Sequence, residues 1–421
     1  MLSEQHAMLR ERDSVLTFDS ALGKILNHTK RLPVVKLRVA ESLGYVLASQ
    51  VKSREPVPLF TSSSVDGFAV RIEDIQRATK ERPVRLTPQE TISAGKVPQK
   101  SLKPGHTAKI MTGAPVPKNT SAVVMKELVT VNGGVVVFRS RAVEGENIRT
   151  RGGEFETGNL VFLPGTRITP PVLGMLVTLG ISSVLVYRKP RIALVITGNE
   201  LRPPSAKLRP GQIRDSNSFS LSASLQWLDI PPSMVVRARD NEKATTAAFA
   251  RALSKADVII SSGGVSVGDF DFVRHALAGL GVKTLFWRVA MKPGKPNFFG
   301  AKGNKLVFGL PGNPVSALVS FEMLLKPALD KMRGIRPSAY PENTALLESD
   351  MRKSAGRVEF VRAFASRGAG GSLSVRPSRG QGSHMVGGLA EANCLIIFPK
   401  ELSILEKGDT VSIRFLSWTQ M

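Results

Sequence analysis

The sequence predicts a multidomain α/β protein whose central domain is a doubly wound, mainly parallel sheet. Three observations along the 421 residues support this fold class. Between Arg191 and Met332, short apolar runs alternate with helical patterns, as expected of parallel strands joined by helices. Residues 51–146 show short β-like runs between Pro and Gly turns, which predict an inserted, mostly-β domain. Residues 336–421 show similar runs, which predict a small C-terminal β-barrel.

The central domain is expected to span residues 188–335. Its strands are predicted at Ile192–Ile196, Met234–Arg239, Val258–Ser262, Thr284–Ala290 and Leu306–Phe308, and its helices near Ser216–Leu228, Thr245–Ser254, Phe272–Ala278 and Pro314–Met332. Ligands of such sheets bind beyond the carboxyl ends of the strands. The loops that follow these strands should therefore carry the functional site.

Residues 1–50 and 147–187 are assigned to a helical linker domain. Apolar residues recur at helical spacing over Thr17–Leu26 and again over Leu37–Val46, which predicts a helix in each segment. Ile168–Tyr187 is uncharged and almost long enough to span a membrane. Because Gly180 interrupts it, the segment is interpreted as a short helix over Val172–Leu179 followed by a strand.

Composition narrows the class of protein. The formal net charge of +24 and pI near 10.5 favour anionic partners, but aromatic residues are only 6% and no nucleic-acid-binding motif is present. Nucleic-acid binding is therefore a minor alternative. The single cysteine, Cys394, excludes a disulfide framework and is expected in a core. The polar N-terminus lacks a signal-peptide pattern, so a cytoplasmic location is expected.

The loop Gly263–Asp271 is the strongest indication of a ligand site. Its glycines, including Gly264 and Gly268, allow backbone N–H groups to approach a phosphate at the start of a helix. Asp269 and Asp271 would repel a bare phosphate, so a divalent cation, magnesium, is expected between the carboxylates and the phosphate. The alternative is that both carboxylates merely stabilise the helix, each by about 0.3–1 kcal/mol.

Three further loops carry suitable groups. Glu200 follows the first strand and Asp240 the second, although an ordinary turn and a helix cap are the respective alternatives. Lys292 and Lys295, held between prolines, would clamp a phosphate or oxyanion. Asn313 is expected to cap the helix that starts at Pro314, whose free N–H groups could bind an anion. Together the loops predict a pocket for a phosphorylated ligand and a divalent metal.

Several of these segments resemble the molybdenum insertases, the molybdopterin molybdenumtransferases typified by MoeA and the E domain of gephyrin. The likeness covers nearly the whole chain, at Ser64–Val70, Lys109–Pro117, Asn147–Glu154, Ser261–Asp269, Lys292–Pro296, Gly309–Ser316 and Gln381–Met385. The resemblance implies a transferase of molybdenum cofactor biosynthesis. It would insert molybdate into adenylylated molybdopterin, cleave the pyrophosphate bond with magnesium and release AMP.

The resemblance also implies a homodimer whose sites are shared between subunits, an elongated linker domain that contributes to dimerisation, and contacts with other proteins of the pathway. The catalytic residues that it implies are Asp66, Thr112, Glu200, Asp240 and Asp271. The motifs and the loops together place substrate binding at Gly263, Gly264, Ser266, Gly268, Arg288, Lys292, Lys295, Pro311, Gly312, Asn313, Pro314 and Ser383. Metal binding is expected at Glu200, Asp269 and Asp271.

The chain departs from the family pattern at a few positions. Thr61 and Ser62 stand where the family often has Asp-Asn, Gly153 precedes Glu154 where two acids are common, and Asn199 stands where Asp is frequent. None of these lies in the phosphate loops. Two alternatives stay open: the related single-domain adenylyltransferase, whose fold resembles residues 191–333, and a scaffold without turnover. The preference for molybdate or tungstate is open as well.

Overall fold

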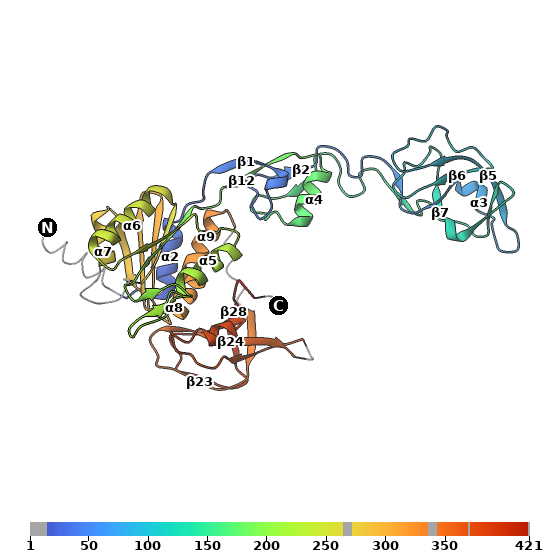
Figure 1. Ribbon diagram of the computed structural model, residues 1–421. Helices are drawn as coiled ribbons and strands as arrows, with labels where there is room; N and C mark the ends of the chain where they lie inside the picture. Colours follow the sequence, from blue (N-terminus) through green and yellow to red (C-terminus); the bar gives the residue numbers. More distant parts are fainter. Residues whose placement is uncertain (1–14, 264–271, 336–342, 369–370, 420–421) are drawn as a thin grey trace. The chain divides into compact units, whose positions relative to one another are not determined.

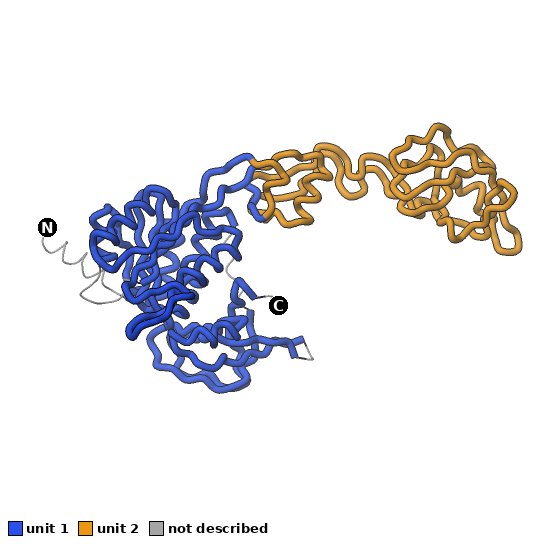
Figure 2. The backbone as a smooth tube through the Cα atoms, viewed as in Figure 1, with its two compact units in different colours: residues 1–36, 44–48, 185–421 blue, residues 37–43, 49–184 orange. Residues whose placement is uncertain are grey.

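The computed structural model describes residues 15–263, 272–335, 343–368 and 371–419. The chain forms two compact units, shown in different colours in Figure 2. The first unit comprises residues 1–36, 44–48 and 185–421, and the second comprises residues 37–43 and 49–184. The predicted fold class, a multidomain α/β protein with additional mostly-β domains, is confirmed.

The first unit is built on a central sheet with helices beside it (Figure 1). Among the described residues, the strand order of this sheet is β16-β13-β17-β21-β20-β18. Neighbours among β16, β13, β17 and β21 are parallel, whereas β20 is antiparallel to both β21 and β18. β18 therefore runs in the same direction as β21. The bounds are β13 Ile192–Thr197, β16 Met234–Ala238, β17 Val258–Ser262, β18 Lys283–Arg288, β20 Pro296–Lys302 and β21 Lys305–Leu310.

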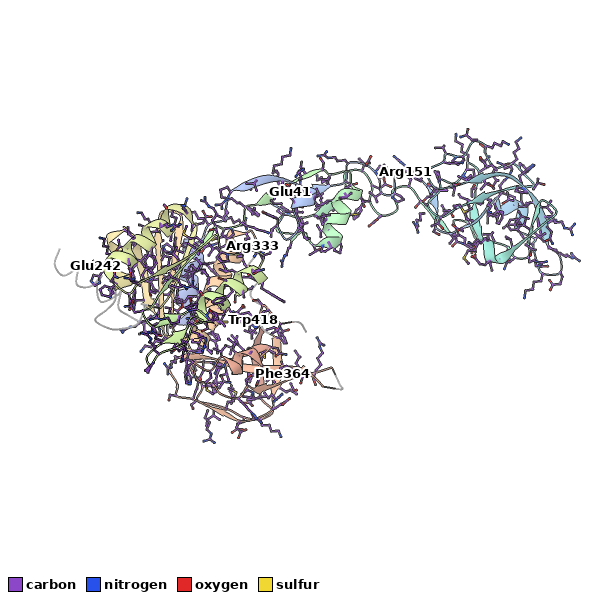
Figure 3. The ribbon with its side chains drawn as sticks, viewed as in Figure 1. Glu41, Arg151, Glu242, Arg333, Phe364 and Trp418 are labelled. Atoms are coloured by element: carbon purple, nitrogen blue, oxygen red, sulfur yellow. The ribbon has the colours of Figure 1, made fainter. Side chains whose placement is uncertain are left out.

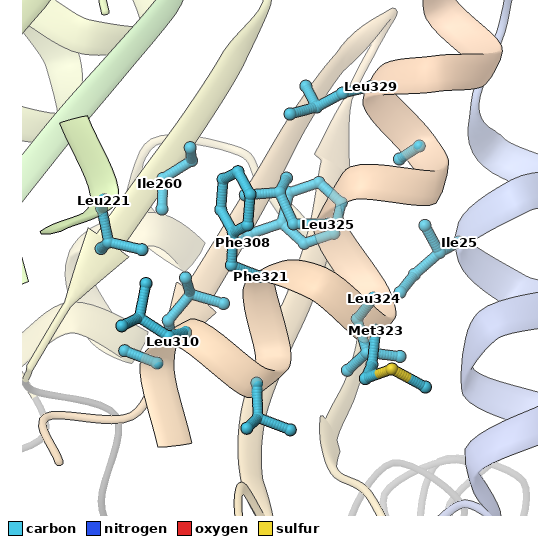
Figure 4. Packing of buried hydrophobic residues seen from close by; sticks show 14 of the residues in the cluster. Ile25, Leu221, Ile260, Phe308, Leu310, Phe321, Met323, Leu324, Leu325 and Leu329 are labelled. Carbon is cyan, nitrogen blue, oxygen red and sulfur yellow. The ribbon is translucent and has the colours of Figure 1, made fainter. Parts of the chain in front are cut away.

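Helices cover both faces of this sheet, because its central strands are apolar on both sides. Ile192 and Leu194 of β13 lie in one core cluster with α2, α5, α8 and α9, while Ala193 and Val195 lie in another with α6 and α7. Figure 4 shows part of the first cluster, where Ile260 and Phe308 face Leu221, Phe321 and Leu325. The helices are α2 Phe18–His28, α5 Asn217–Trp227, α6 Glu242–Lys255, α7 Phe272–Gly279, α8 Pro314–Ser320 and α9 Lys326–Met332.

The long helix predicted over Pro314–Met332 exists, but a π-helical segment, η3 Phe321–Leu325, separates α8 from α9. Glu322 in this segment is only 3% exposed and accepts a hydrogen bond from Ser417 Oγ. Burial raises the pKa of the Glu322 carboxyl. After α9, Arg333 (Figure 3) donates to the Leu228 carbonyl at 2.9 Å and ties this helical layer to the end of α5.

The C-terminal part of the first unit is a closed barrel. β24 pairs with β25 and β26, and the strand sequence β25-β22-β28-β26 closes the ring. Cys394 is buried in its core, and burial raises the pKa of this thiol to about 12. β19, Met291–Lys292, extends the ladder from β24. The other bounds are β22 Asn343–Leu347, β23 Met351–Arg352, β24 Val358–Arg367, β25 Leu373–Pro377, α10 Gly387–Ala390, β26 Cys394–Phe398, β27 Ile404–Leu405 and β28 Thr410–Phe415.

The second unit contains a mostly antiparallel sheet of order β7-β4-β6-β5-β9-β8, in which the described residues form core clusters around Phe138 and around Ile110. Its elements are η1 Val39–Glu41, β2 Val51–Lys52, β3 Ser62–Ser63, β4 Gly67–Val70, α3 Ile72–Ile75, β5 Val84–Ile92, β6 His106–Ile110, β7 Ala122–Met125, η2 Lys126–Leu128, β8 Val129–Asn132, β9 Val135–Phe138, β10 Ile148–Arg149, β11 Leu160–Phe162 and α4 Pro170–Thr178.

Ile168–Tyr187 forms a helix and a strand, as predicted: α4 ends at Thr178 and β12 spans Ser183–Tyr187. Across the described ranges, no helix combines the length and the apolar character that crossing a bilayer requires.

Two expectations about secondary structure were wrong. The helix predicted over Leu37–Val46 is instead the strand β1, Val34–Arg38, followed by the single 3₁₀ turn η1. The β-branched Val34 and Val35 favour a strand, and Gly44 adopts a φ of +79° that a helix does not allow. The second is the strand list of the central domain, which contained no strand at Pro296–Lys302, where β20 lies.

One helix lies in a different core from the one expected. The sequence assigned residues 1–50 to the linker domain, but Ala21 and Ile25 of α2 are buried in the helical layer of the central sheet. The other domain limits proposed from the sequence stay predictions.

Candidate functional site

The central sheet reverses its strand order between β13 and β17. From β13 the chain passes to β16 on one side and then returns to β17 on the other side. In open α/β sheets the crevice for a ligand forms at such a reversal, outside the carboxyl ends of the strands. Thr197 ends β13 and Ser262 ends β17, so the candidate site lies between these two residues.

Gly263 allows the two strand ends to approach each other. Its φ is +87°, and a Cβ atom added there would lie 2.7 Å from the Thr197 carbonyl oxygen. Any other side chain at Gly263 would therefore clash with backbone and strain the turn. This is the first of the predicted substrate-binding residues, and it stands at the strand reversal.

A cleft of about 610 Å³ opens at this edge, and we call it the carboxyl-edge cleft. Its volume lies within the range of about 300–1,000 Å³ that is usual for small-molecule sites. Its lining includes the predicted residues Glu200, Asp240, Gly263, Pro311, Gly312, Asn313 and Pro314. Thr197, whose hydroxyl and the Glu200 carboxylate follow the first strand and could together bind a metal or a nucleotide, also lines the cleft. The sequence did not single out the other polar lining residues, which are Arg214, Asp215, Ser216, Asn217, Ser262, Ser316 and His384.

Two carboxylates, those of Glu200 and Asp240, line the carboxyl-edge cleft. Burial and, second, the charge of Glu200 raise the pKa of Asp240. The backbone N–H of Asp240 donates to Asn199 Oδ1 at 3.2 Å, which ties the two loops together. Asn199, one of the departures from the family pattern, therefore has a structural role here.

This pair of carboxylates has the chemistry of a partial magnesium site. Mg²⁺ is usually held by one or two carboxylates together with waters and phosphate oxygens. A cation would oppose both causes of the raised pKa of Asp240, the burial of its carboxyl and the repulsion from Glu200. The buried Thr197 Oγ1 has no hydrogen-bond partner in the described ranges and offers a further oxygen. Among the residues that the structure describes, no group of three or more Asp, Glu, His or Cys converges.

Asn217 joins the two loops that form the far wall of the cleft. Its Nδ2 donates to Ser262 Oγ at 2.7 Å and to the Gly312 carbonyl at 2.8 Å. Its Oδ1 is buried and has no partner among the described residues. A hydrogen-bond acceptor is thus available inside the cleft.

Asp215 fixes the helix on which Asn217 stands. Its carboxylate accepts from Ser218 N at 2.9 Å and from Arg237 Nε at 3.2 Å at the start of α5. Sequence reasoning missed both Asp215 and Asn217. The only available signal was Asp215-Ser216-Asn217 directly before a helical pattern, which is common at helix starts and so is not specific.

The C-terminal barrel contributes to the same cleft. Asn313 Nδ2 donates to Ser383 Oγ at 3.0 Å, and Val315 N donates to the Ser383 carbonyl at 3.2 Å. Asn313 occupies the N-cap position predicted for it, but its side chain makes no capping hydrogen bond. It bridges to Ser383 instead, so that Ser383 is brought to the cleft, next to His384, which lines it.

A buried arginine holds the turn before Ser383. Arg362 is 1% exposed, and its Nη2 and Nη1 donate to the carbonyls of Gly380 at 2.6 Å and Gly382 at 3.3 Å. The Gln381 side chain accepts a hydrogen bond from the backbone N–H of Arg362 and donates one to the Arg362 carbonyl. Burial lowers the pKa of Arg362. No pattern in the sequence indicates that this arginine supports the site.

The predicted cationic loop lies beside the cleft but is not in its lining. Pro296, opposite Arg288 in the sheet, does line the cleft, whereas Arg288, Lys292 and Lys295 do not. Lys292 Nζ forms an ion pair of 2.8 Å with Glu359 Oε1. Its charge is thus already balanced by a carboxylate from the barrel. The backbone carbonyl of Lys295 accepts from Val289 N at 2.9 Å, which closes the turn.

The remaining predicted residues of the central domain, Gly264, Ser266, Gly268, Asp269 and Asp271, lie outside the described residues. The substrate-binding and metal-binding roles assigned to them stay predictions.

Asp66 and Thr112 are in contact within the second unit. Asp66 Oδ1 accepts from both the backbone N–H and the hydroxyl of Thr112, at 2.9 and 2.8 Å, and Oδ2 accepts from Lys126 Nζ at 3.4 Å. The hydrogen bonds from Thr112 and then from Lys126 lower the pKa of Asp66. The two residues of this domain to which the sequence assigned a catalytic role are thus hydrogen-bonded to each other, and their catalytic role stays a prediction.

Comparisons with known proteins agree with this architecture. Residues 16–180 match the MoeA N-terminal region (domain I and II), residues 193–331 a probable molybdopterin binding domain, and residues 344–416 the MoeA C-terminal region (domain IV). The carboxyl-edge cleft is lined mainly by residues of the second of these regions.

Full-length relatives and a solved structure extend the likeness. A molybdopterin molybdenumtransferase of Haemophilus influenzae is 35% identical over 405 residues, covering 95% of this chain and 98% of that protein. One of Bacillus subtilis is 35% identical over 408 residues, covering 96% and 94%. The crystal structure of a molybdopterin biosynthesis MoeA protein from Pyrococcus horikoshii OT3 has a TM-score of 0.79 at 28% identity, covering 96% of this chain and 100% of that chain.

Proposed function

Because this chain belongs to the molybdopterin molybdenumtransferase family, a family of transferases that insert molybdenum in molybdenum cofactor biosynthesis, we propose that its substrates are molybdate and adenylylated molybdopterin. In the proposed reaction the pyrophosphate bond of the adenylylated substrate is cleaved. AMP and the molybdenum cofactor are the products.

The charge of the carboxyl-edge cleft is the observation that carries this proposal. Asp215 is paired with Arg237, which leaves Glu200 and Asp240 against Arg214 in the described lining. The two carboxylates would repel a diphosphate unless a divalent cation lay between the carboxylates and the diphosphate. A pocket with carboxylates on one side and glycine turns on the other therefore suits a magnesium–diphosphate ligand better than an uncharged one.

Glu200, Asp240 and the hydroxyl of Thr197 would hold this magnesium ion, together with Asp269 and Asp271, to which the sequence assigns metal binding. When bound, the ion would neutralise charge on the diphosphate. The chain's own residues do the rest. Gly263 and Gly312 keep side chains away from the ligand, and Asn217 holds their two loops at a fixed separation.

Asn313 and Ser383 would orient the substrate. Asn313 and Ser383 are already bonded to each other, so both side chains have fixed positions before a ligand arrives. Such preorganisation reduces the ordering cost of binding. Arg288, Lys292 and Lys295 would attract molybdate or phosphate to the neighbouring loop, as the sequence motif suggests, and Lys292 would have to leave Glu359 to do so.

We further propose a cytoplasmic homodimer in which Asp66 and Thr112 of one subunit complete the site of the other. Within the second unit, Asp66 is exposed enough to meet a ligand, with 39% of its side chain accessible. The mass of the protein in solution, measured by light scattering, tests the dimer directly.

The reaction is tested by incubating the full chain with adenylylated molybdopterin, molybdate and magnesium, and by measuring AMP chromatographically. We expect AMP release that requires both molybdate and magnesium. Asp240→Asn should reduce it strongly. The matched control is Glu242→Gln, which neutralises an exposed carboxylate in the first turn of α6, outside the cleft lining (Figure 3).

Formation of the molybdenum cofactor without AMP release would show that the adenylylated compound is not the substrate. AMP release in the absence of molybdate would separate hydrolysis from insertion and contradict the proposed coupling. Equal activity of Asp240→Asn and Glu242→Gln would remove Asp240 from the mechanism.

A further inference from the structure

A second cleft, of about 930 Å³, lies at the amino ends of the same strands, and we call it the amino-edge cleft. Asp257, directly before β17, and Lys305, the first residue of β21, belong to its lining. β17 has five residues, which at about 3.3 Å per residue places this cleft roughly 16 Å from the carboxyl ends of the strands. The molybdenum insertion chemistry makes no use of it.

The amino-edge cleft carries an excess of positive charge. Among the described residues, its lining contains Lys30, Arg31, Arg188, Lys302 and Lys305 and a single carboxylate. That carboxylate, Asp257, is bound by Arg188 and by Arg191 from outside the lining, so it leaves no negative charge for the other cations.

The lysines are held without being neutralised. Lys302 Nζ donates to the Leu280 carbonyl and Lys305 Nζ to the Ala256 carbonyl, both at 2.7 Å. Within the described part of the chain, neither these two lysines nor Lys30 forms an ion pair. Carbonyl groups orient the ammonium groups but do not cancel their charge.

The base of the amino-edge cleft is apolar. Leu253 and Met332 are 6% and 2% exposed, and Leu32 and Leu280 are half-buried, whereas the cations Lys30 and Lys302 are exposed. The cleft thus combines an apolar base with a cationic border.

The helix ends decide which anion fits. α6 ends at Lys255 and α7 at Gly279, so the carbonyl ends of two helices point toward this cleft. A helix C-terminus carries partial negative charge and disfavours a compact phosphate placed deep among these carbonyls. A ligand whose carboxylates stay at the cationic border avoids these carbonyls, and an apolar side chain of the same ligand can occupy the base of the cleft.

We propose that the amino-edge cleft docks an acidic segment of a partner protein. In this complex, a large apolar side chain of the partner sits against Leu253 and Met332, and flanking carboxylates meet Lys30 and Lys302. The net charge of +24 supports such a partner, because long-range attraction accelerates the encounter with an acidic protein. The proposal does not rest on the substrate assigned to the carboxyl-edge cleft.

The test uses the full chain and a fluorescein-labelled peptide of alternating glutamate and leucine, with binding followed by fluorescence anisotropy. A peptide of glutamate and serine, equal in length and charge, is the control ligand. The double variant Lys30→Glu/Lys302→Glu should bind the leucine peptide roughly tenfold more weakly, since two border contacts are reversed. Its molybdenum insertion activity and melting temperature should be unchanged.

The matched control variant is Lys100→Glu/Lys118→Glu, which makes the same change of net charge at two exposed lysines of the second unit. If both double variants weaken binding equally, only net charge is involved and the site is wrong. If the serine peptide binds as well as the leucine peptide, the apolar base has no role and the proposal fails. If inorganic phosphate displaces the peptide better than chloride of equal ionic strength, the cleft is a phosphate site instead.

Discussion

Replacing Asp257 by asparagine removes a carboxylate that joins the start of β17 to residues 188–191 at the amino edge of the central sheet. Its oxygens accept from Arg188 Nη1 and Nη2 at 2.8 and 3.1 Å, and from the backbone N–H of Arg191 at 2.8 Å. The Asp257 side chain is 13% exposed and that of Arg188 is 30% exposed, so solvent screens this pair only weakly. Asparagine keeps the shape but not the charge.

The size of the effect follows from the pKa. Burial opposes ionisation of Asp257, but the hydrogen bonds from Arg188 and then Arg191 outweigh it and lower the pKa from an ordinary 3.8 to about 2. At 1.36 kcal/mol for each pKa unit, ionised Asp257 stabilises the fold by about 2 kcal/mol. Because the folded-state pKa is the lower one, this contribution is complete above about pH 4 and is lost as the pH falls through about 2.

Urea unfolding followed by tryptophan fluorescence measures this contribution. The three tryptophans, Trp227, Trp287 and Trp418, all belong to the first unit, so the signal reports on that unit alone. We expect Asp257→Asn to lower the free energy of unfolding by about 2–3 kcal/mol at pH 7, and by much less near pH 2.5. Asp19→Asn, an exposed acid in the first turn of α2, is the control and should cost at most about 1 kcal/mol. A difference that persists unchanged at low pH would refute the electrostatic account.

Three further predictions concern the carboxyl-edge cleft. Asp240→Asn should raise the melting temperature in EDTA, because it removes the repulsion from Glu200, and it should abolish the stabilisation by magnesium. Since the pKa of Asp240 is raised, the stabilisation of the wild type by magnesium should begin to weaken at a higher pH than it would with an ordinary aspartate. Thermal melting with and without magnesium across a pH series checks both expectations. Asn217→Ala loses two hydrogen bonds and should cost about 2 kcal/mol of unfolding free energy in urea; an unchanged midpoint would show that the bridge between the loops is not stabilising. Arg362→Met should leave the melting temperature nearly unchanged, because an apolar side chain of similar length replaces a buried charge, but should lower kcat/KM about tenfold or more through misplacement of the turn that carries Ser383; equal kcat/KM in steady-state assays would exclude a positioning role.

The strands of the central domain could be predicted because their evidence is local. β13 and β17 are buried at every position and begin with runs of apolar residues, as expected of strands covered on both faces, and the following loops begin with glycine and polar residues. The error at Leu37–Val46 arose because Val39, Leu43 and Val46 happen to recur at helical spacing. Only Val39 of these initiates a helical turn, and it is a single 3₁₀ turn.

Contacts between distant segments could not be predicted in the same way. Lys292 and Glu359 are ion-paired, although 67 positions separate them in the chain. The lysine alone suggested a free cation for an anionic ligand. Arg362 and Ser383 belong to the barrel, and only its closure shows that the arginine supports the turn beside the cleft.

The strand order explains why some site residues carried a sequence signal and others did not. Gly263 and Glu200 follow strands directly, so any parallel sheet would bring them to the carboxyl edge. Asn217 becomes important only because β17 lies next to both β13 and β21, which places Ser262 and Gly312 within reach of one amide. The charges of the two edges also differ: among the described residues, Glu200 and Asp240 line the cleft at the carboxyl edge, and Lys30, Lys302 and Lys305 line the cleft at the amino edge. The excess of basic residues is therefore not a property of the cleft proposed for the phosphorylated substrate, and at the amino edge a different, acidic ligand is the physically consistent partner.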